Sequence, residues 1–147
     1  MIRKVAFGCD HGGYDYKEQV IKHLNDKGVE IIDCGTYNRE SVDYPVFADK
    51  VCNEITSNNA EAGILICGTG IGMSIAANKH RGIRAACCEN TYSARMTRAH
   101  NDSNVLCFGA RVIGIEVALD MIDLFLDTEF MGGRHERRVA MLNDLDK

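Results

Sequence analysis

Short hydrophobic runs alternate along the chain with segments in which apolar residues recur every three or four positions. Tyr16, Val20 and Leu24, for example, share one helical face ahead of Gly28. This spacing is typical of helices, and the compact apolar runs are typical of buried strands. The predicted strands are residues 5–9, 29–33, 62–67, 83–88 and 105–108. The predicted helices are residues 16–27, 47–55, 70–79, 91–100, 115–125 and 135–145.

Five alternations of strand and helix predict a parallel sheet with helices on both faces. Right-handed connections favour a doubly wound, Rossmann-like (flavodoxin-like) three-layer α/β sandwich. No repeat or linker divides the chain, so we expect residues 1–147 to form one domain. In such sheets ligands bind beyond the carboxyl ends of the strands. The segments there are residues 9–11, 34–36, 67–69 and 108–111.

Composition and charge exclude several classes of function. The net charge of −4 provides no general basic surface for nucleic acid. No apolar run is long enough to cross a membrane, and no signal-like segment opens the chain, so we expect a cytoplasmic protein. Seven cysteines without a C-x-x-C pair favour neither a disulfide scaffold nor a structural zinc site. Most are expected to be small buried apolar residues: Cys34, Cys52, Cys87, Cys88 and Cys107.

The segment 67–72, Cys-Gly-Thr-Gly-Ile-Gly, follows the third predicted strand and carries the most distinctive pattern. It departs from the dinucleotide fingerprint G-x-G-x-x-G because Met73 replaces the last glycine. Closely spaced glycines instead suit a loop whose backbone N–H groups bind a phosphate or a developing oxyanion. Because Cys67 stands at the start of a helix, we expect its pKa to be lowered. We interpret it as a base or nucleophile.

Other candidates flank predicted strands. Asp10 and His11 lie in a glycine-bounded turn after the first strand, and His100 ends the helix before the fifth. Arg134 and Arg138 share one face of the last helix, and no acidic residue stands four positions before either. Two guanidiniums on one face suit a phosphate, and Arg111 could join them. The glycines at 132–133 could bend that helix away from its own domain.

Together these segments resemble the type B ribose-5-phosphate isomerases, in a family that includes galactose-6-phosphate and allose-6-phosphate isomerases. The resemblance spans nearly the whole chain in order. It is carried by residues 8–13 (GCDHGG), 43–45 (DYP), 67–72 (CGTGIG), 76–79 (AANK), 100–102 (HND), 109–111 (GAR) and 132–135 (GGRH). A branch with a glutamate after the third glycine lacks the cysteine. This chain has Met73 there, which leaves Cys67 as the base.

The resemblance implies an aldose–ketose isomerase without metal or cofactor, acting through a cis-enediol. By analogy Cys67 moves the proton between C2 and C1, and His100 opens the furanose ring. The enediolate oxygens would be held by Thr69 and the loop amides, those of Gly68, Gly70, Ile71 and Gly72. The sugar would lie near Asp10 and Tyr44, with Asn101 on a hydroxyl. The phosphate would be bound by His11, Arg111 and, from the other subunit of a homodimer, Arg134 and Arg138.

The expected reaction interconverts D-ribose 5-phosphate and D-ribulose 5-phosphate in the non-oxidative pentose phosphate pathway. Two alternatives stay open at this point. One is the same chemistry on a six-carbon sugar phosphate, and the other is a non-catalytic sensor of nucleotides or sugar phosphates. A dimer and a tetramer are likewise not distinguished.

Overall fold

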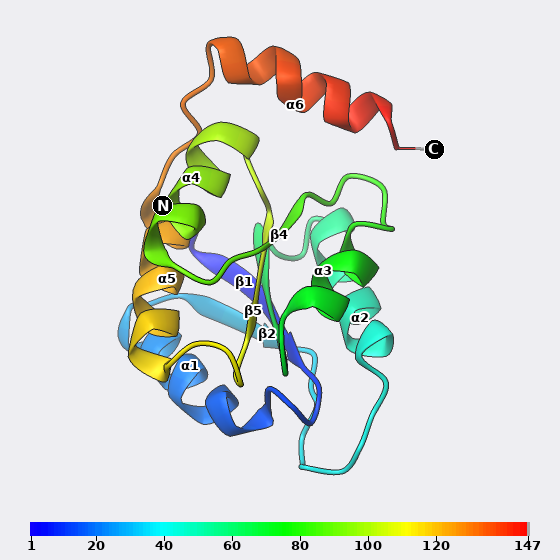
Figure 1. Ribbon diagram of the computed structural model, residues 1–147, viewed down its shortest axis with the longest axis vertical. Helices are drawn as coiled ribbons and strands as arrows, with labels where there is room; N and C mark the ends of the chain where they lie inside the picture. Colours follow the sequence, from blue (N-terminus) through cyan, green and yellow to red (C-terminus); the bar gives the residue numbers. More distant parts are fainter. Residues whose placement is uncertain (147) are drawn as a thin grey trace.

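The computed structural model describes residues 1–146 and has the predicted three-layer α/β fold (Figure 1). The strands are β1 (Lys4–Cys9), β2 (Glu30–Asp33), β3 (Ala62–Cys67), β4 (Ala85–Cys87) and β5 (Val105–Gly109). The helices are α1 (Tyr14–Asp26), α2 (Tyr44–Thr56), α3 (Ile71–Ala77), α4 (Thr91–Asn101), α5 (Ile115–Asp127) and α6 (Arg134–Asp144). All five strands run parallel.

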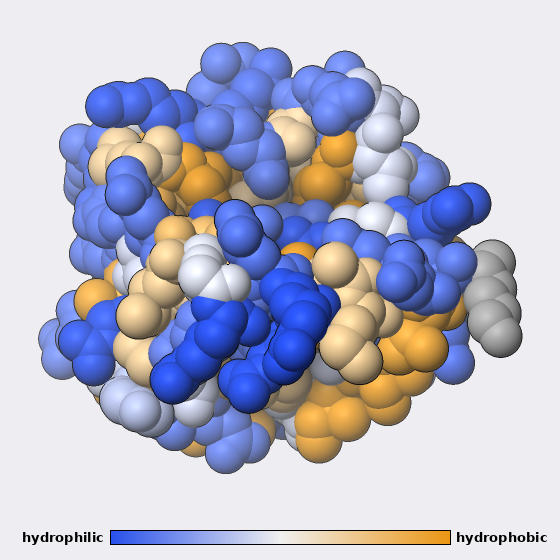
Figure 2. Space-filling view, turned by 90° about the horizontal axis from the view of Figure 1, so that it is seen from above, coloured by the Kyte–Doolittle hydropathy of each residue, from blue (hydrophilic) through white to orange (hydrophobic). Residues whose placement is uncertain are grey.

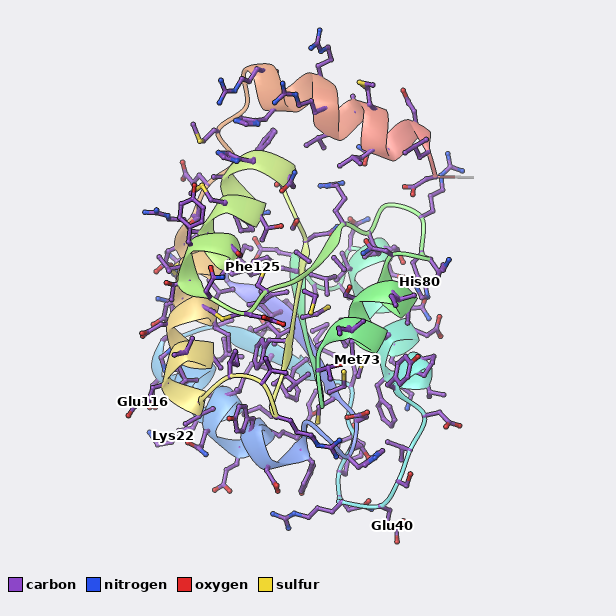
Figure 3. The ribbon with its side chains drawn as sticks, in the orientation of Figure 1. Lys22, Glu40, Met73, His80, Glu116 and Phe125 are labelled. Carbon is purple, nitrogen blue, oxygen red and sulfur yellow. The ribbon has the colours of Figure 1, made fainter. Side chains whose placement is uncertain are left out.

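Two hydrophobic cores lie on opposite faces of the sheet. One is built from α1, α4 and α5, and the other from α2 and α3. Figure 3 shows Phe125 of α5 and Met73 of α3 on the two sides of the sheet, and both are fully buried. Burial explains why Met73 replaces a glycine of the dinucleotide fingerprint, because this position belongs to the core.

The strand order is β2-β1-β3-β5-β4. It therefore departs from the flavodoxin-like order by exchanging the last two strands. Burial explains the exchange. All five residues of β5 are buried, whereas no residue of β4 is, so β5 suits the interior of the sheet and β4 its edge.

The helices sit where right-handed connections place them. The chain crosses the sheet in one direction from β2 to β3 and from β3 to β4, and both helices, α2 and α3, cover the same face. It moves in the opposite direction from β1 to β2 and from β4 to β5, and α1 and α4 cover the other face. The exchanged strands thus place α4 beside α5.

β4 is shorter than the predicted strand 83–88. The backbone N–H of Ile83 is used in a turn to the carbonyl of His80, and that of Arg84 donates to the side chain of Asn104. Neither is available for the sheet ladder. The edge position also makes one prediction wrong, because Cys87 is exposed rather than buried. Its Sγ donates to the carbonyl of Thr69 at 3.7 Å.

α6 lies apart from the three layers, beyond the amino ends of the strands and across the end of α4 (Figure 1). Gly132 and Gly133 both have positive φ, 64° and 58°, a conformation that glycine adopts without strain. The predicted bend is therefore confirmed. Viewed from this end of the molecule, the surface is mostly hydrophilic, with hydrophobic residues gathered in patches (Figure 2). The large apolar residues exposed on α6 are Met141 and Leu142, and Leu145, directly after the helix, is exposed as well.

Candidate active site

The glycine loop joins the end of β3 to α3 and encloses the sulfur of Cys67. The backbone N–H of Gly70 donates to Cys67 Sγ at 3.1 Å, and only 5% of Cys67 is exposed. Gly70 has φ 79°, and a Cβ there would lie 2.7 Å from the backbone of Phe108. The loop can therefore turn back onto the sulfur only with glycine at this position.

Thr69 stands at the exposed tip of the loop. Its Oγ1 accepts the N–H of Ile71 at 3.3 Å. Two of the amides expected to hold an oxyanion are therefore engaged within the loop, that of Gly70 by the sulfur and that of Ile71 by the threonine. Ile71 itself begins α3 with its side chain exposed.

Residues from distant parts of the sequence pack closely on this loop. A Cβ on Gly72 would lie 2.7 Å from the ring of Tyr44, and a Cβ on Gly68 would lie 3.2 Å from Nη1 of Arg111. The N–H of Arg111 donates to the carbonyl of Gly68 at 3.0 Å. The structure thus places Tyr44 beside Gly72 and Arg111 beside Gly68.

The turn after β1 lies next to the glycine loop. A Cβ on Gly12 would lie 2.9 Å from the backbone nitrogen of Gly68, so this turn also contacts the glycine loop. Asp10 is buried, and its Oδ1 accepts the N–H groups of Gly12 at 2.8 Å and Gly13 at 3.2 Å. His11 is half-buried, and its Nδ1 accepts the N–H of Val42 at 3.2 Å. When the ring is neutral its proton is then on Nε2, which can donate to a ligand.

The other cysteines are held as neutral thiols. Burial raises the pKa of Cys9, Cys34 and Cys88 to about 11 and that of Cys52 to about 12. Burial also raises the pKa of Cys107, well above its usual value, and that of Cys87. A reactive thiolate is not expected at these positions.

The remaining predicted site residues lie at the other end of the strands, beyond their amino ends. Cys67 pairs with Gly109 at the carboxyl end of β5, whereas His100 and Asn101 end the helix that leads into the start of β5. Five residues of strand span about 15 Å. Arg134 and Arg138 lie in α6, at the same edge as His100. The two groups cannot contact one small ligand within a single chain.

His135 was not among the predicted site residues, yet it contacts one of them. Its ring stacks on that of His100 with centroids 4.3 Å apart and 10° between the planes. Only 6% of His135 is exposed, and its buried Nε2 has no hydrogen-bond partner within residues 1–146. The available signal was its position four residues before Val139, which places both on the buried face of α6.

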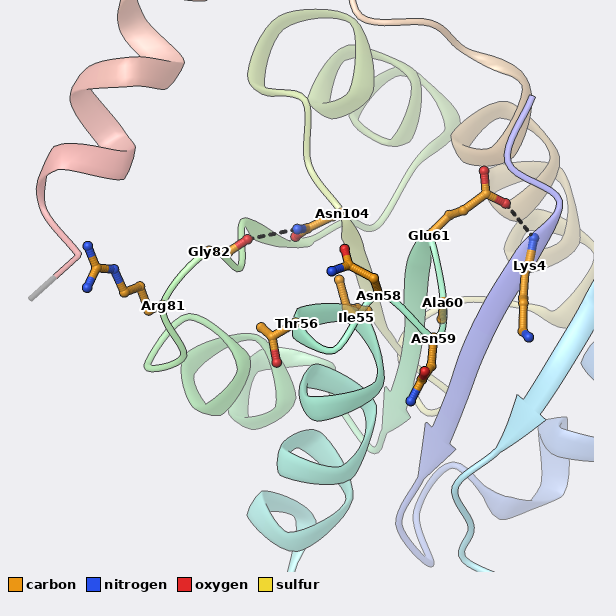
Figure 4. A pocket seen from close by; sticks show the side chains of 10 residues that line it. All are labelled: Lys4, Ile55, Thr56, Asn58, Asn59, Ala60, Glu61, Arg81, Gly82 and Asn104. Atoms are coloured by element: carbon orange, nitrogen blue, oxygen red, sulfur yellow. Dashed lines mark hydrogen bonds between the residues drawn. The ribbon is translucent and has the colours of Figure 1, made fainter.

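Other hollows lie away from the glycine loop. One of about 620 Å³ opens at the amino ends of β1 and β3, next to the loop after α2 (Figure 4). Two pairs of its lining residues are hydrogen-bonded: the N–H of Lys4 donates to Glu61, and the side chain of Asn104 donates to the carbonyl of Gly82. Within residues 1–146, no three His, Cys, Asp or Glu side chains are grouped to hold a metal ion. No helix in the same range is long and apolar enough to cross a bilayer.

Comparison with known proteins places this arrangement in a family. A family model described as Ribose/Galactose Isomerase matches residues 5–142. Ribose-5-phosphate isomerase B of Escherichia coli is 47% identical over 99% of this chain and 98% of its own length. The solved ribose-5-phosphate isomerase B of Clostridium thermocellum has a TM-score of 0.95 at 51% identity, covering 97% of this chain and 96% of its own. The type B enzyme of Leishmania infantum has a TM-score of 0.95 at 44% identity, covering 99% and 97%. The chain belongs to the ribose/galactose isomerase family.

Proposed function

We propose that this protein is an isomerase that interconverts D-ribose 5-phosphate and D-ribulose 5-phosphate, the activity for which its relatives are named. The observation that supports this most directly is the sulfur of Cys67 beneath the N–H of Gly70, inside a loop of backbone donors. Such a group can remove a proton whose loss generates an oxyanion nearby. A role in the non-oxidative pentose phosphate pathway would place the protein in the cytoplasm.

In the proposed reaction the thiolate of Cys67 removes the proton from C2 of the open-chain aldose. The electrons of the C–H bond form the C1–C2 double bond, and the carbonyl oxygen on C1 becomes the enediolate oxygen. Protonation of that oxygen gives the cis-enediol. Loss of the proton on the C2 hydroxyl and return of the proton from sulfur to C1 then complete the ketose. The hydroxyl and N–H groups around Thr69 would stabilise the anionic intermediate.

We infer that the complete site takes residues from two copies of the chain. One copy supplies Cys67, Thr69, His11 and Arg111 around the glycine loop. The other supplies the groups from the opposite edge of its sheet: His100 for ring opening, Asn101 for a hydroxyl, and Arg134 and Arg138 for the phosphate. The two arginines form no ion pair within residues 1–146, so their charge is available to a ligand.

Two inactive variants test the base and the sharing of the site together. Cys67→Ala and His100→Asn should each abolish isomerisation of ribose 5-phosphate, whereas Cys52→Ala, which alters a buried thiol elsewhere, should not. Co-expressed, the two inactive chains should form mixed dimers that each have one intact site. The mixture should then recover about one quarter of the wild-type specific activity, because half of the dimers are mixed.

Either half of the proposal can fail separately. Full activity of Cys67→Ala would refute the base. No recovery in a mixture shown to contain mixed dimers would refute the shared site. Wild-type protein that binds the sugar phosphate without turnover would instead indicate a sensor, and a higher kcat/KM for allose 6-phosphate would indicate a six-carbon substrate.

A further inference from the structure

Arg84, directly before β4, binds the end of α4 through Nε and Nη2 of its guanidinium group. Nε donates to the carbonyl oxygens of Asn101 and Asp102, both at 3.1 Å, and Nη2 donates to the Asp102 carbonyl at 2.7 Å. Only 19% of the Arg84 side chain is exposed. The fixed fork of an arginine reaches the two neighbouring carbonyls from separate nitrogens, whereas a lysine carries all of its donors on one nitrogen.

The end of α4 needs these contacts because the chain reverses sharply there. Asp102 has φ 46° and ψ 42°, a left-handed conformation that ends the helix and leaves its last carbonyls without helical partners. The Asp102 carboxylate is in turn held by Arg84 at 3.2 Å and by Arg98 at 2.9 Å. Two arginines therefore fix the backbone and the side chain of the residue that follows His100 and Asn101.

The same guanidinium also reaches the last helix. Nη1 of Arg84 donates to Oδ1 of Asn143 in α6 at 3.1 Å, across a cleft of about 420 Å³. At the other end of α6, His135 stacks on His100. Because α6 is attached to the end of α4 at both points, the groups assigned to ring opening and to phosphate form one unit.

We propose that Arg84 is a positioning residue for ring opening, which holds the end of α4 so that His100 and Asn101 face the sugar bound by the partner copy. This inference rests on the proposed isomerase function. In ring opening the C1–O4 bond breaks, the C1 hydroxyl loses its proton and O4 gains one. Arg84 takes no part in these transfers, and it acts by fixing the residues that carry them out.

The two sugars allow ring opening to be measured apart from proton abstraction. Ribose 5-phosphate is a furanose that must open, whereas ribulose 5-phosphate stays open because its O5 carries the phosphate. Exchange of the C1 hydrogen of ribulose 5-phosphate with deuterium oxide therefore requires the base and the glycine loop but no ring step. The ratio of turnover of ribose 5-phosphate to this exchange reports on ring opening alone.

We expect Arg84→Lys to lower kcat for ribose 5-phosphate by about tenfold or more, since lysine lacks the fork. At saturating ribulose 5-phosphate, where a weaker phosphate contact from α6 does not limit the rate, exchange at C1 should stay within about twofold of wild type. Asp102→Asn keeps the size of the side chain and tolerates a left-handed conformation, but it removes the charge held by the two arginines. It should lower the ratio of ribose 5-phosphate turnover to C1 exchange by about threefold. Arg81→Lys, an exposed arginine in the preceding loop, is the matched control and should change neither rate.

The outcomes separate this inference from the proposed function. A wild-type protein that neither isomerises nor exchanges would refute the function itself. If wild type does both, and the folded Arg84→Lys and Asp102→Asn variants keep both rates or lose them in equal proportion, the positioning role is refuted. Thermal melting identifies a variant that does not fold, and the other variant then decides the result.

Discussion

Replacing Gly109 with alanine tests whether the glycine loop must be held against the end of β5. Gly109 is the residue of β5 that pairs with Cys67. An added Cβ would lie 2.5 Å from two backbone atoms of Thr69 and 2.6 Å from the carbonyl oxygen of Gly68. These are backbone atoms, so the clash cannot be relieved by turning a side chain.

The size of the effect follows from these distances. Ordinary van der Waals contact starts at 3.4 Å, so Thr69 must move by about 0.9 Å. Overpacking of this kind costs about 1–3 kcal/mol. For a chain of this length that corresponds to a fall in Tm of about 2–12 °C. A displacement of about 1 Å at a reacting centre can lower the rate by about 100-fold.

The assay compares Gly109→Ala with Gly114→Ala by thermal melting and by kcat/KM for ribose 5-phosphate. Gly114 has φ −68°, and no atom lies within 4 Å of an added Cβ, so alanine should be tolerated there. We expect a large loss of activity in the first variant and little change in the second. If Gly109→Ala retained its kcat/KM within about threefold, the close approach of loop and strand would not matter for the reaction.

Two further predictions concern α6. Burial lowers the pKa of His135, and the charges of His100, Arg134 and Arg138 add to this. Below the ordinary value of 6.5 the unfolded chain therefore takes up a proton that the folded chain does not, and stability should fall as the pH drops. Wild type should lose more Tm than His135→Asn between about pH 7.5 and 5.5, and equal losses would contradict this. Arg134→Ala should raise KM about 10–150-fold through loss of a phosphate contact of about 1.5–3 kcal/mol, an effect that the exposed neighbour control Arg137→Ala should not share.

Local patterns in the sequence predicted nearly all of the secondary structure. Apolar periodicity identifies an element when one of its faces is buried, and every element from β1 to α5 packs on one of the two cores. β4 was the least accurate, because an edge strand is defined by its partner rather than by its own hydrophobicity. For the same reason the exposure of Cys87 could not be predicted from its apolar neighbours.

The order of the strands required information that local patterns do not contain. Strand alternation predicts a parallel sheet but leaves open which strand stands at an edge. The hydrophobicity of β4 and β5 favours the observed order, in which β5 is interior and β4 is at the edge. β5 contains only apolar residues, whereas the charged Arg84 directly precedes β4. The contact of His135 with His100 was missed because the two residues are far apart in sequence and α6 follows a glycine bend whose direction the sequence does not specify.

Parallel topology itself explains why the candidate site divides into two groups. Each helix runs antiparallel to the strand before it. Residues that end a strand therefore gather beyond the carboxyl ends of the strands, and residues that end a helix gather beyond the amino ends. Cys67 ends β3 and His100 lies in the last turn of α4, which places them at opposite ends of the strands in any sheet of this kind. A reaction that needs both must join two chains. In the proposed twofold dimer the carboxyl ends of one sheet would meet the amino ends of the other twice, which would give two equivalent sites.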